Sequence, residues 1–123
     1  MIAETALFCL AINIYHEARG EPLQGQLAVA MVTLNRAKKR QDRICNEVFK
    51  PYQFSWTIGW SIQQPGVHDL KAFNKAKQVA IKALQSKQDP TGGATHYHNH
   101  TVNPAWANKL AYVGQIGNHH FYR

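Results

Sequence analysis

Glu17 is the acidic residue whose place in the sequence best suits proton-transfer chemistry. It lies near the end of Thr5–Ala18, a segment whose apolar residues recur at helical spacing. A carboxyl group at the edge of an apolar face is partly withdrawn from water, which raises its pKa and lets it donate a proton near neutral pH. Asn13 lies one helical turn earlier, and we expect it to orient this carboxyl group. The alternative is a solvated carboxylate paired with Arg19 or a lysine.

The other acidic residues have simpler interpretations. Helix capping or solvation accounts for five of the seven acids in the chain, namely Glu4, Asp42, Glu47, Asp69 and Asp89. Glu21 is close to Glu17 in the sequence but follows the helix-breaking Gly20. We therefore expect Glu21 to orient Arg19 or to bind substrate.

Aromatic and polar residues further along the chain suit a carbohydrate site. Sugar rings present apolar faces that stack on aromatic side chains, and hydroxyl groups that need polar partners. Phe54, Ser55, Trp56 and Tyr97 offer both kinds of contact. The alternative for Phe54 and Trp56 is a place in the hydrophobic core.

A cluster of histidines near the C-terminus raises the alternative of a metal site. His96, His98 and His100 alternate, so a strand would place them on one face, and His119 and His120 follow. Such a cluster could hold zinc for an amidase or a protease. The pair His16-Glu17 lacks the second histidine of an H-E-x-x-H helix, and we therefore predict no metal.

Composition and charge limit the remaining classes. The 123 residues predict one domain, and the net charge of +7 favours polyanionic partners such as nucleic acid or the anionic cell wall. No basic-aromatic motif supports a nucleic-acid-binding module. The two cysteines exclude a framework of several disulfides, and we expect two reduced, buried thiols rather than one bridge. The apolar run Thr5–Ile14 is too short to span a bilayer and lacks the flanks of a signal peptide.

The elements that would position these residues are mainly helical. Helices are predicted over Thr5–Ala18, over Leu23–Lys39, from an Asp69 N-cap to Ser86, and from Asn103 through Trp106. Pro51–Gly66 has the composition of a long loop or a short hairpin, and Asp89–Gly93 is a turn. A strand over Ala94–His98 can pair with His120–Arg123. The sequence therefore predicts a mainly α fold (α+β) with a small antiparallel sheet.

Several motifs together resemble one known family. The segment Tyr15–Pro22 reads YHEARGEP, and further matching motifs are Gly25–Ala30, Leu34–Arg36, Gln53–Trp56, Gly92–Tyr97, Pro104 with Trp106, and Ile116–His119 before Phe121. In this order they resemble the SleB/CwlJ family of cell wall hydrolases over almost the whole chain.

The resemblance implies a single lysozyme-like catalytic domain, 1–123, that cuts peptidoglycan between N-acetylmuramic acid and N-acetylglucosamine without a cofactor. It implies that Glu17 is catalytic and that the substrate is bound by Glu21, Phe54, Ser55, Trp56, Thr95, Tyr97 and His119. A lytic transglycosylase needs one carboxylate, whereas a muramidase needs a second one, so the scarcity of acids favours the former. We expect a monomer without stable membrane insertion, made in the cytoplasm and released to the wall as phage lysins are.

Overall fold

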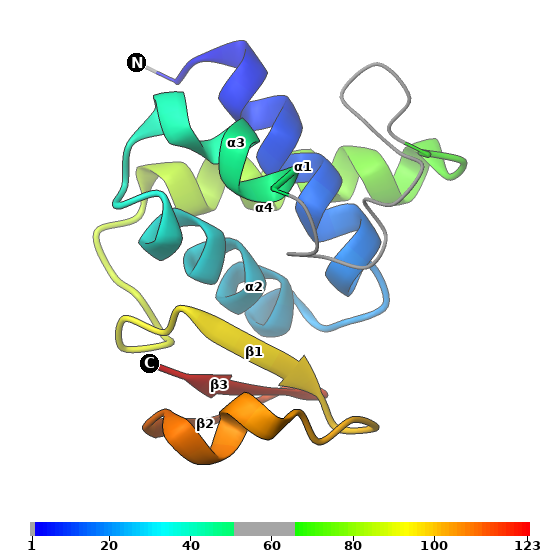
Figure 1. Ribbon diagram of the computed structural model, residues 1–123. Coiled ribbons are helices and arrows are strands. Elements are labelled where there is room, and N and C mark those ends of the chain that lie inside the picture. Colours follow the sequence, from blue (N-terminus) through cyan, green and yellow to red (C-terminus); the bar gives the residue numbers. More distant parts are fainter. Residues whose placement is uncertain (1, 51–65) are drawn as a thin grey trace.

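The helices form where apolar residues recur at helical spacing. The computed structural model describes residues 2–50 and 66–123. In it α1 spans Glu4–Ala18, α2 Leu23–Arg36, α3 Ile44–Val48 and α4 Leu70–Gln85 (Figure 1). Apolar side chains surround α1 almost completely, so it is buried over most of its length and packs against the other three helices. The predicted central helix is thereby confirmed.

The end of α2 differs from the prediction, which continued the helix to Lys39. The helix ends at Arg36, because Lys38 and Lys39 adopt positive φ angles of 54° and 61°. The Lys39 N–H donates to the carbonyl of Leu34 at 2.8 Å, which closes the helix with a Schellman-type turn. Such turns usually contain glycine, and its absence here concealed the helix end from the sequence.

The start of α4 follows its predicted cap. Asp69 precedes the helix in an extended conformation, and its carboxylate accepts a hydrogen bond from the Ala72 N–H at 3.0 Å. The segment predicted as a short helix from Asn103 forms only the 3-10 turn η3, Ala105–Lys109. Another short 3-10 turn, η1 (Gln41–Arg43), leads into α3, and the sequence had predicted neither η1 nor α3.

An antiparallel sheet lies against α2 on the side away from α1 and α4 (Figure 1). Within the described residues it contains β1 (His96–Asn99), β2 (Tyr112–Ile116) and β3 (His119–Tyr122), in the order β1-β3-β2. The predicted pairing of the C-terminal segment with the strand after the Gly-Gly turn is confirmed. The sequence did not predict β2, because a register shift between Tyr112 and Gly114 interrupts its alternation.

The core has two parts, and α2 contributes to both. One face of α2, including Met31 and Leu34, packs with α1, α3 and α4. The opposite face, including Val29 and Val32, packs against Phe121 of the sheet. This central position of α2 fixes the sheet relative to the end of α1.

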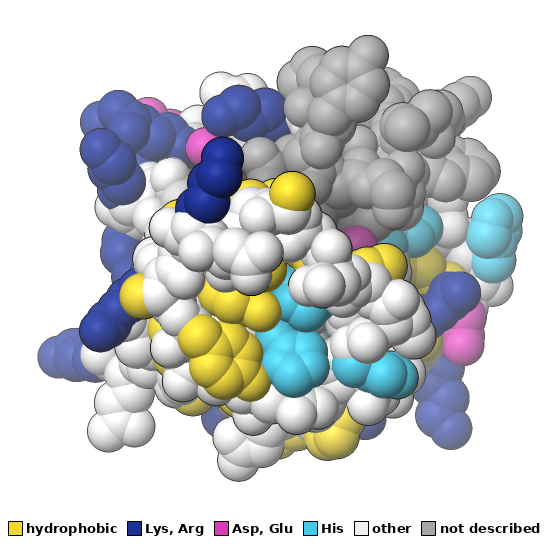
Figure 2. Space-filling view, turned by 60° about the horizontal axis from the view of Figure 1, so that its bottom comes forward, with side chains coloured by type: hydrophobic (Ala, Val, Ile, Leu, Met, Phe, Trp, Pro, Cys, Tyr) yellow, Lys and Arg dark blue, Asp and Glu magenta, His cyan; other side chains and the backbone are white. Residues whose placement is uncertain are grey.

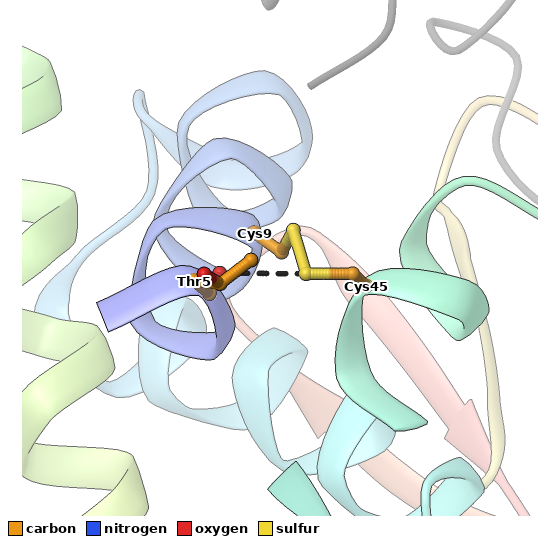
Figure 3. Close-up of a disulfide and its surroundings, with 3 residues drawn as sticks. All are labelled: Thr5, Cys9 and Cys45. Atoms are coloured by element: carbon orange, nitrogen blue, oxygen red, sulfur yellow. Dashed lines mark hydrogen bonds between the residues drawn. A yellow bond between two sulfur atoms is a disulfide. The ribbon is translucent and has the colours of Figure 1, made fainter. Parts of the chain in front are cut away.

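A disulfide joins Cys9 of α1 to Cys45 of α3 (Figure 3). The expectation of two reduced thiols is therefore wrong. The cysteines are 36 positions apart in the sequence, yet packing of α3 on α1 brings their Cα atoms to 5.2 Å. Sequence separation gave no sign of this contact. The Cys45 sulfur also lies 3.4 Å from the carbonyl oxygen of Thr5.

In the described part of the chain, no helix has the length and apolar character needed to cross a membrane.

Reduction of the disulfide should destabilise the domain. A cross-link over 36 positions restricts the unfolded chain, so its loss should lower the free energy of unfolding by about 4 kcal/mol. Urea denaturation with and without reductant measures the change. The double variant Cys9→Ala/Cys45→Ala should match the reduced protein and should not respond to reductant. An unchanged midpoint after complete thiol release would contradict the prediction.

Candidate active site

The carboxyl group of Glu17 lies where the helices meet the sheet. Glu17 occupies the last turn of α1 and is half-buried, and its Oε1 accepts a hydrogen bond from the hydroxyl of Tyr97 in β1. The Tyr97 ring packs against the rings of His119, at a centroid distance of 5.2 Å, and Phe121, at 5.8 Å. Two residues predicted for the site, far apart in the sequence, are therefore in direct contact.

The surroundings of Glu17 favour its protonated form. Burial raises the pKa of this carboxyl group, and the hydrogen bond from Tyr97 and the positive charge of Arg36 reverse only part of that rise. The carboxyl group also lies at the C-terminal end of α1, where the helix dipole disfavours negative charge. The net pKa of Glu17 is higher than that of an ordinary glutamate, as a general acid requires.

The end of α2 holds β1 in place beside Glu17. The Nε of Arg36 donates a hydrogen bond to the carbonyl of Thr95 at 2.5 Å. The side-chain amide of Asn35 donates to the carbonyl of Ala94 and to the carboxylate of Asp89, both at 2.8 Å. These bonds fix the turn before β1, so the position of Tyr97 depends on α2.

Asn13 does not make the hydrogen bond that the sequence suggested. Its side chain is buried, and its Oδ1 accepts a hydrogen bond from the Thr33 hydroxyl at 2.7 Å. Its Nδ2 is buried and has no hydrogen-bond partner among the described residues. The contact with α2 therefore replaces the expected contact with Glu17, because Thr33 packs directly against this side of α1.

A cleft of about 490 Å³ opens above Glu17. Its described lining consists of His16, Glu17, Tyr97, His98, Asn99, Val102, Pro104, Trp106 and His119. All seven acidic residues of the chain lie in the described part, and of these only Glu17 lines the cleft. Tyr97 and His119, both predicted to bind substrate, line the cleft together with Glu17, and their role in binding stays a prediction. The sequence did not single out Asn99, at the end of β1, or Trp106, in η3, as site residues, because only the fold brings these two elements to the same cleft as Glu17.

Glu21 is held in a different environment. Its Oε1 accepts a hydrogen bond from the Asn118 N–H at 2.7 Å, and its Oε2 accepts one from the Asn118 side-chain amide at 3.0 Å. Gly117 has a φ of 58°, and a Cβ atom there would collide with the Glu21 carboxylate. Glu21 thus fastens the turn between β2 and β3 to the loop between α1 and α2.

The two glutamates have opposite pKa shifts. Burial raises the pKa of Glu21, but the hydrogen bonds from Asn118 and the nearby His119 ring outweigh it, so the net pKa is lowered. The His119 Nδ1 lies 3.4 Å from the Glu21 carboxylate, and burial lowers the pKa of His119. Glu21 is therefore an anion that holds structure, and its predicted contact with substrate stays a prediction.

The remaining predicted substrate residues divide into two groups. Thr95 makes contacts within the protein: its N–H donates to the Tyr122 carbonyl at 3.0 Å, and its hydroxyl lies 3.0 Å from His96 Nδ1. Its role in substrate binding stays a prediction. Phe54, Ser55 and Trp56 lie outside the described residues.

The histidines do not assemble into a metal centre. The register of β1 and β3 places His98 beside His120 on the face of the sheet opposite to His119. His98 and His120 instead contact tyrosine hydroxyls, of Tyr122 at 2.8 Å and Tyr112 at 2.9 Å. The described residues contain no group of three or more His, Cys, Asp or Glu that could hold a metal ion. The geometry therefore gives the metal-dependent amidase alternative no support.

Comparison with known proteins agrees with this arrangement. Residues 20–122 match the family described as Cell Wall Hydrolase. The chain belongs to this cell wall hydrolase family. It is similar to the spore cortex-lytic enzymes of Halalkalibacterium halodurans, at 35% identity over 115 residues, and Bacillus subtilis, at 31% over 116 residues. These matches cover 91% of this chain but only 33% and 35% of the two relatives, so the chain spans about a third of their length.

Solved structures of this family share the fold. The catalytic domain of the Bacillus cereus SleB protein superposes with a TM-score of 0.80 at 28% identity, covering 100% of this chain and 93% of that one. The catalytic domain of the germination-specific lytic transglycosylase SleB of Bacillus anthracis gives a TM-score of 0.79 at 29% identity, covering 98% and 96%. The predicted family and the predicted helical fold with a small sheet are both confirmed.

The opposite pKa shifts of the two glutamates predict opposite effects of Gln substitution on stability. The pKa of Glu17 is higher in the folded state than in the unfolded state. The free energy of unfolding therefore falls as the pH rises from the unfolded-state pKa to the folded-state pKa. Glu17→Gln should therefore stabilise the protein at neutral pH and change little at about pH 3. Urea denaturation at both pH values measures this.

Glu21→Gln is the matched control. The pKa of Glu21 is lower in the folded state than in the unfolded state, so its ionised form stabilises the fold at pH values above the unfolded-state pKa. This stability is lost as the pH falls through the folded-state pKa. Glu21→Gln should therefore destabilise the protein at neutral pH. Equal destabilisation by both substitutions at neutral pH would contradict the assigned environments.

Proposed function

We propose that this domain is a lytic transglycosylase that cuts the glycan strands of peptidoglycan, with Glu17 as its catalytic acid and base. The observation that carries the proposal is a single protonatable carboxyl group, with a raised pKa, at the base of a cleft between helices and sheet. The fold shared with the lytic transglycosylase SleB of Bacillus anthracis supports the same reaction class.

One carboxyl group is enough for both steps of this reaction. Protonated Glu17 donates its proton to the glycosidic oxygen while the bond from that oxygen to C1 of N-acetylmuramic acid breaks. The resulting carboxylate then takes the proton from the C6 hydroxyl of the same sugar, and the C6 oxygen bonds to C1. The product is a 1,6-anhydro ring, no water is consumed, and Glu17 ends in its protonated form.

The surrounding residues suit this cycle. Tyr97 donates a hydrogen bond to Glu17 and orients the carboxyl group toward the cleft. The positive charge of Arg36 stabilises the carboxylate that exists between the two steps, since it lowers the pKa of Glu17. We assign both as positioning residues, because neither needs to touch the reacting atoms.

A muramidase is the second candidate and is less well supported. Retaining and inverting glycosidases place a second carboxyl group about 5–9.5 Å from the first. Three of the other acids accept hydrogen bonds within the protein. Glu21 accepts one from Asn118, Asp89 accepts one from Thr91 in the turn before β1, and Asp69 accepts one from Ala72 as the cap of α4. None of the six lines the described cleft.

Charge and the disulfide suit action at a cell wall. A net charge of +7 attracts an anionic polymer through long-range fields that salt weakens. The bond between Cys9 and Cys45 would persist in an oxidising compartment rather than in a reducing cytoplasm. Release in the manner of a phage lysin stays a prediction.

Glu17→Gln should abolish glycan cleavage. The amide cannot donate a proton at an accessible pH, so the rate on purified peptidoglycan should fall by at least about 100-fold. Mass spectrometry of the wild-type digest should show muropeptides lighter by one water than hydrolysis products. Glu4→Gln, in the exposed first turn of α1, is the control and should stay active. Products at the full hydrolytic mass would instead identify a muramidase.

Tyr97→Phe should shift the pH dependence of cleavage. The hydrogen bond from Tyr97 lowers the pKa of Glu17, so its removal raises that pKa and keeps the acid protonated to higher pH. The alkaline limb of kcat/KM should move upward, whereas Tyr112→Phe, at an exposed position of β2, should leave it in place. A limb that stays fixed in Tyr97→Phe would show that another group controls it.

A further inference from the structure

The cleft extends from Glu17 past the end of β1 to η3. Its distal wall is formed by His98, Asn99, Val102, Pro104 and Trp106, none of which the proposed chemistry uses. Figure 2 views the molecule from the side of the sheet and shows histidine and hydrophobic side chains adjoining at the centre of this face. Lys and Arg side chains gather mainly toward its edges.

The indole of Trp106 is held in place by neighbouring rings. Its centroid lies 5.2 Å from that of His96, 5.8 Å from that of His98 and 5.3 Å from that of Tyr122, which it meets at 90°. His98 is fixed in turn, since its Nε2 lies 2.8 Å from the Tyr122 hydroxyl and its Nδ1 lies 2.9 Å from the carbonyl of Asn99. Trp106 is nevertheless only half-buried and lines the cleft.

A fixed, partly exposed indole is a suitable surface for a sugar ring. Its position is set before binding, so contact with a ligand costs little side-chain entropy. The apolar C–H face of a pyranose can stack on such a ring, with the His98 ring forming the adjoining wall and the side-chain amide of Asn99 nearby for a hydroxyl.

The charge of the lining also points to a neutral ligand. The described residues that line the cleft include no Lys or Arg, and Glu17 is their one acid. The carboxylates of a peptide stem would find no Lys or Arg among them, whereas the ring of N-acetylglucosamine needs no cation. The cleft therefore suits the glycan itself better than its peptide cross-links.

We propose that Trp106 and His98 form a saccharide subsite that binds a sugar ring of the glycan strand at a distance from the bond being cut. This inference rests on the proposed function. The subsite binds the strand and takes no part in proton transfer. Its loss should weaken binding while the bound strand is still cleaved.

The test compares Trp106→Ala and His98→Ala with the wild type in cleavage of peptide-free glycan strands. Each substitution should raise KM by at least about 10-fold, as expected for loss of a stacked contact of about 1.4 kcal/mol, and should change kcat less than 3-fold. Tyr112→Ala is the matched control. Tyr112 is 55% exposed on the same aromatic face, contacts the rings of His120 and Tyr122, and does not line the cleft, so the KM of this variant should not change.

Binding to an inactive form separates this inference from the function on which it rests. In the Glu17→Gln background, a tetrasaccharide of alternating N-acetylglucosamine and N-acetylmuramic acid should shift the Trp106 indole N–H signal in NMR spectra. Trp106→Phe keeps a ring and should recover part of the affinity that Trp106→Ala loses, which distinguishes stacking from folding damage. An unchanged KM in folded Trp106→Ala would overturn the subsite alone, whereas a wild type that cleaves no glycan would overturn the proposed function.

Discussion

The hydrogen bond from Tyr97 to Glu17 joins the helices to the sheet at the proposed catalytic centre. Glu17 is carried by α1, a helix buried over most of its length, and Tyr97 by a short strand that would not be stable alone. The contact requires α2 to lie between them with one apolar face toward each half. It also requires Arg36 to hold the start of β1. The helical core thus serves to keep one carboxyl group partly dehydrated beside an open cleft.

Glu17 and Glu21 show how nearby residues acquire different chemistry. Glu17 lies at a helix C-terminus, where burial outweighs its favourable contacts and its pKa is raised. Glu21 lies just beyond the helix, where the amide groups of Asn118 satisfy both carboxylate oxygens and its pKa is lowered. Glu17 is therefore suited to donate and accept a proton, whereas Glu21 is suited to fix the turn between β2 and β3. The turn at Gly20 and Pro22 separates these environments.

The sequence predicted what local periodicity and caps determine, and missed what tertiary contacts determine. The helices α1 and α4 and the Asp69 cap follow directly from spacing and residue type. The disulfide, the bulged strand β2 and the Lys38 turn depend on packing or on backbone conformations that composition does not show. For the site, Glu17 and Tyr97 were identified separately, but their contact was not. The sequence also contained no sign that Trp106 contacts His98 on the outward face of β1, because this contact depends on how η3 packs against the sheet.

The most direct test of the central claim is a titration of the Glu17 carboxyl carbon by NMR, followed beside the pH profile of cleavage. Glu17 should titrate above the ordinary glutamate range, with a midpoint that coincides with the alkaline limb of kcat/KM. A Glu17 midpoint at or below the ordinary value, in an enzyme that still cleaves glycan strands near neutral pH, would contradict it.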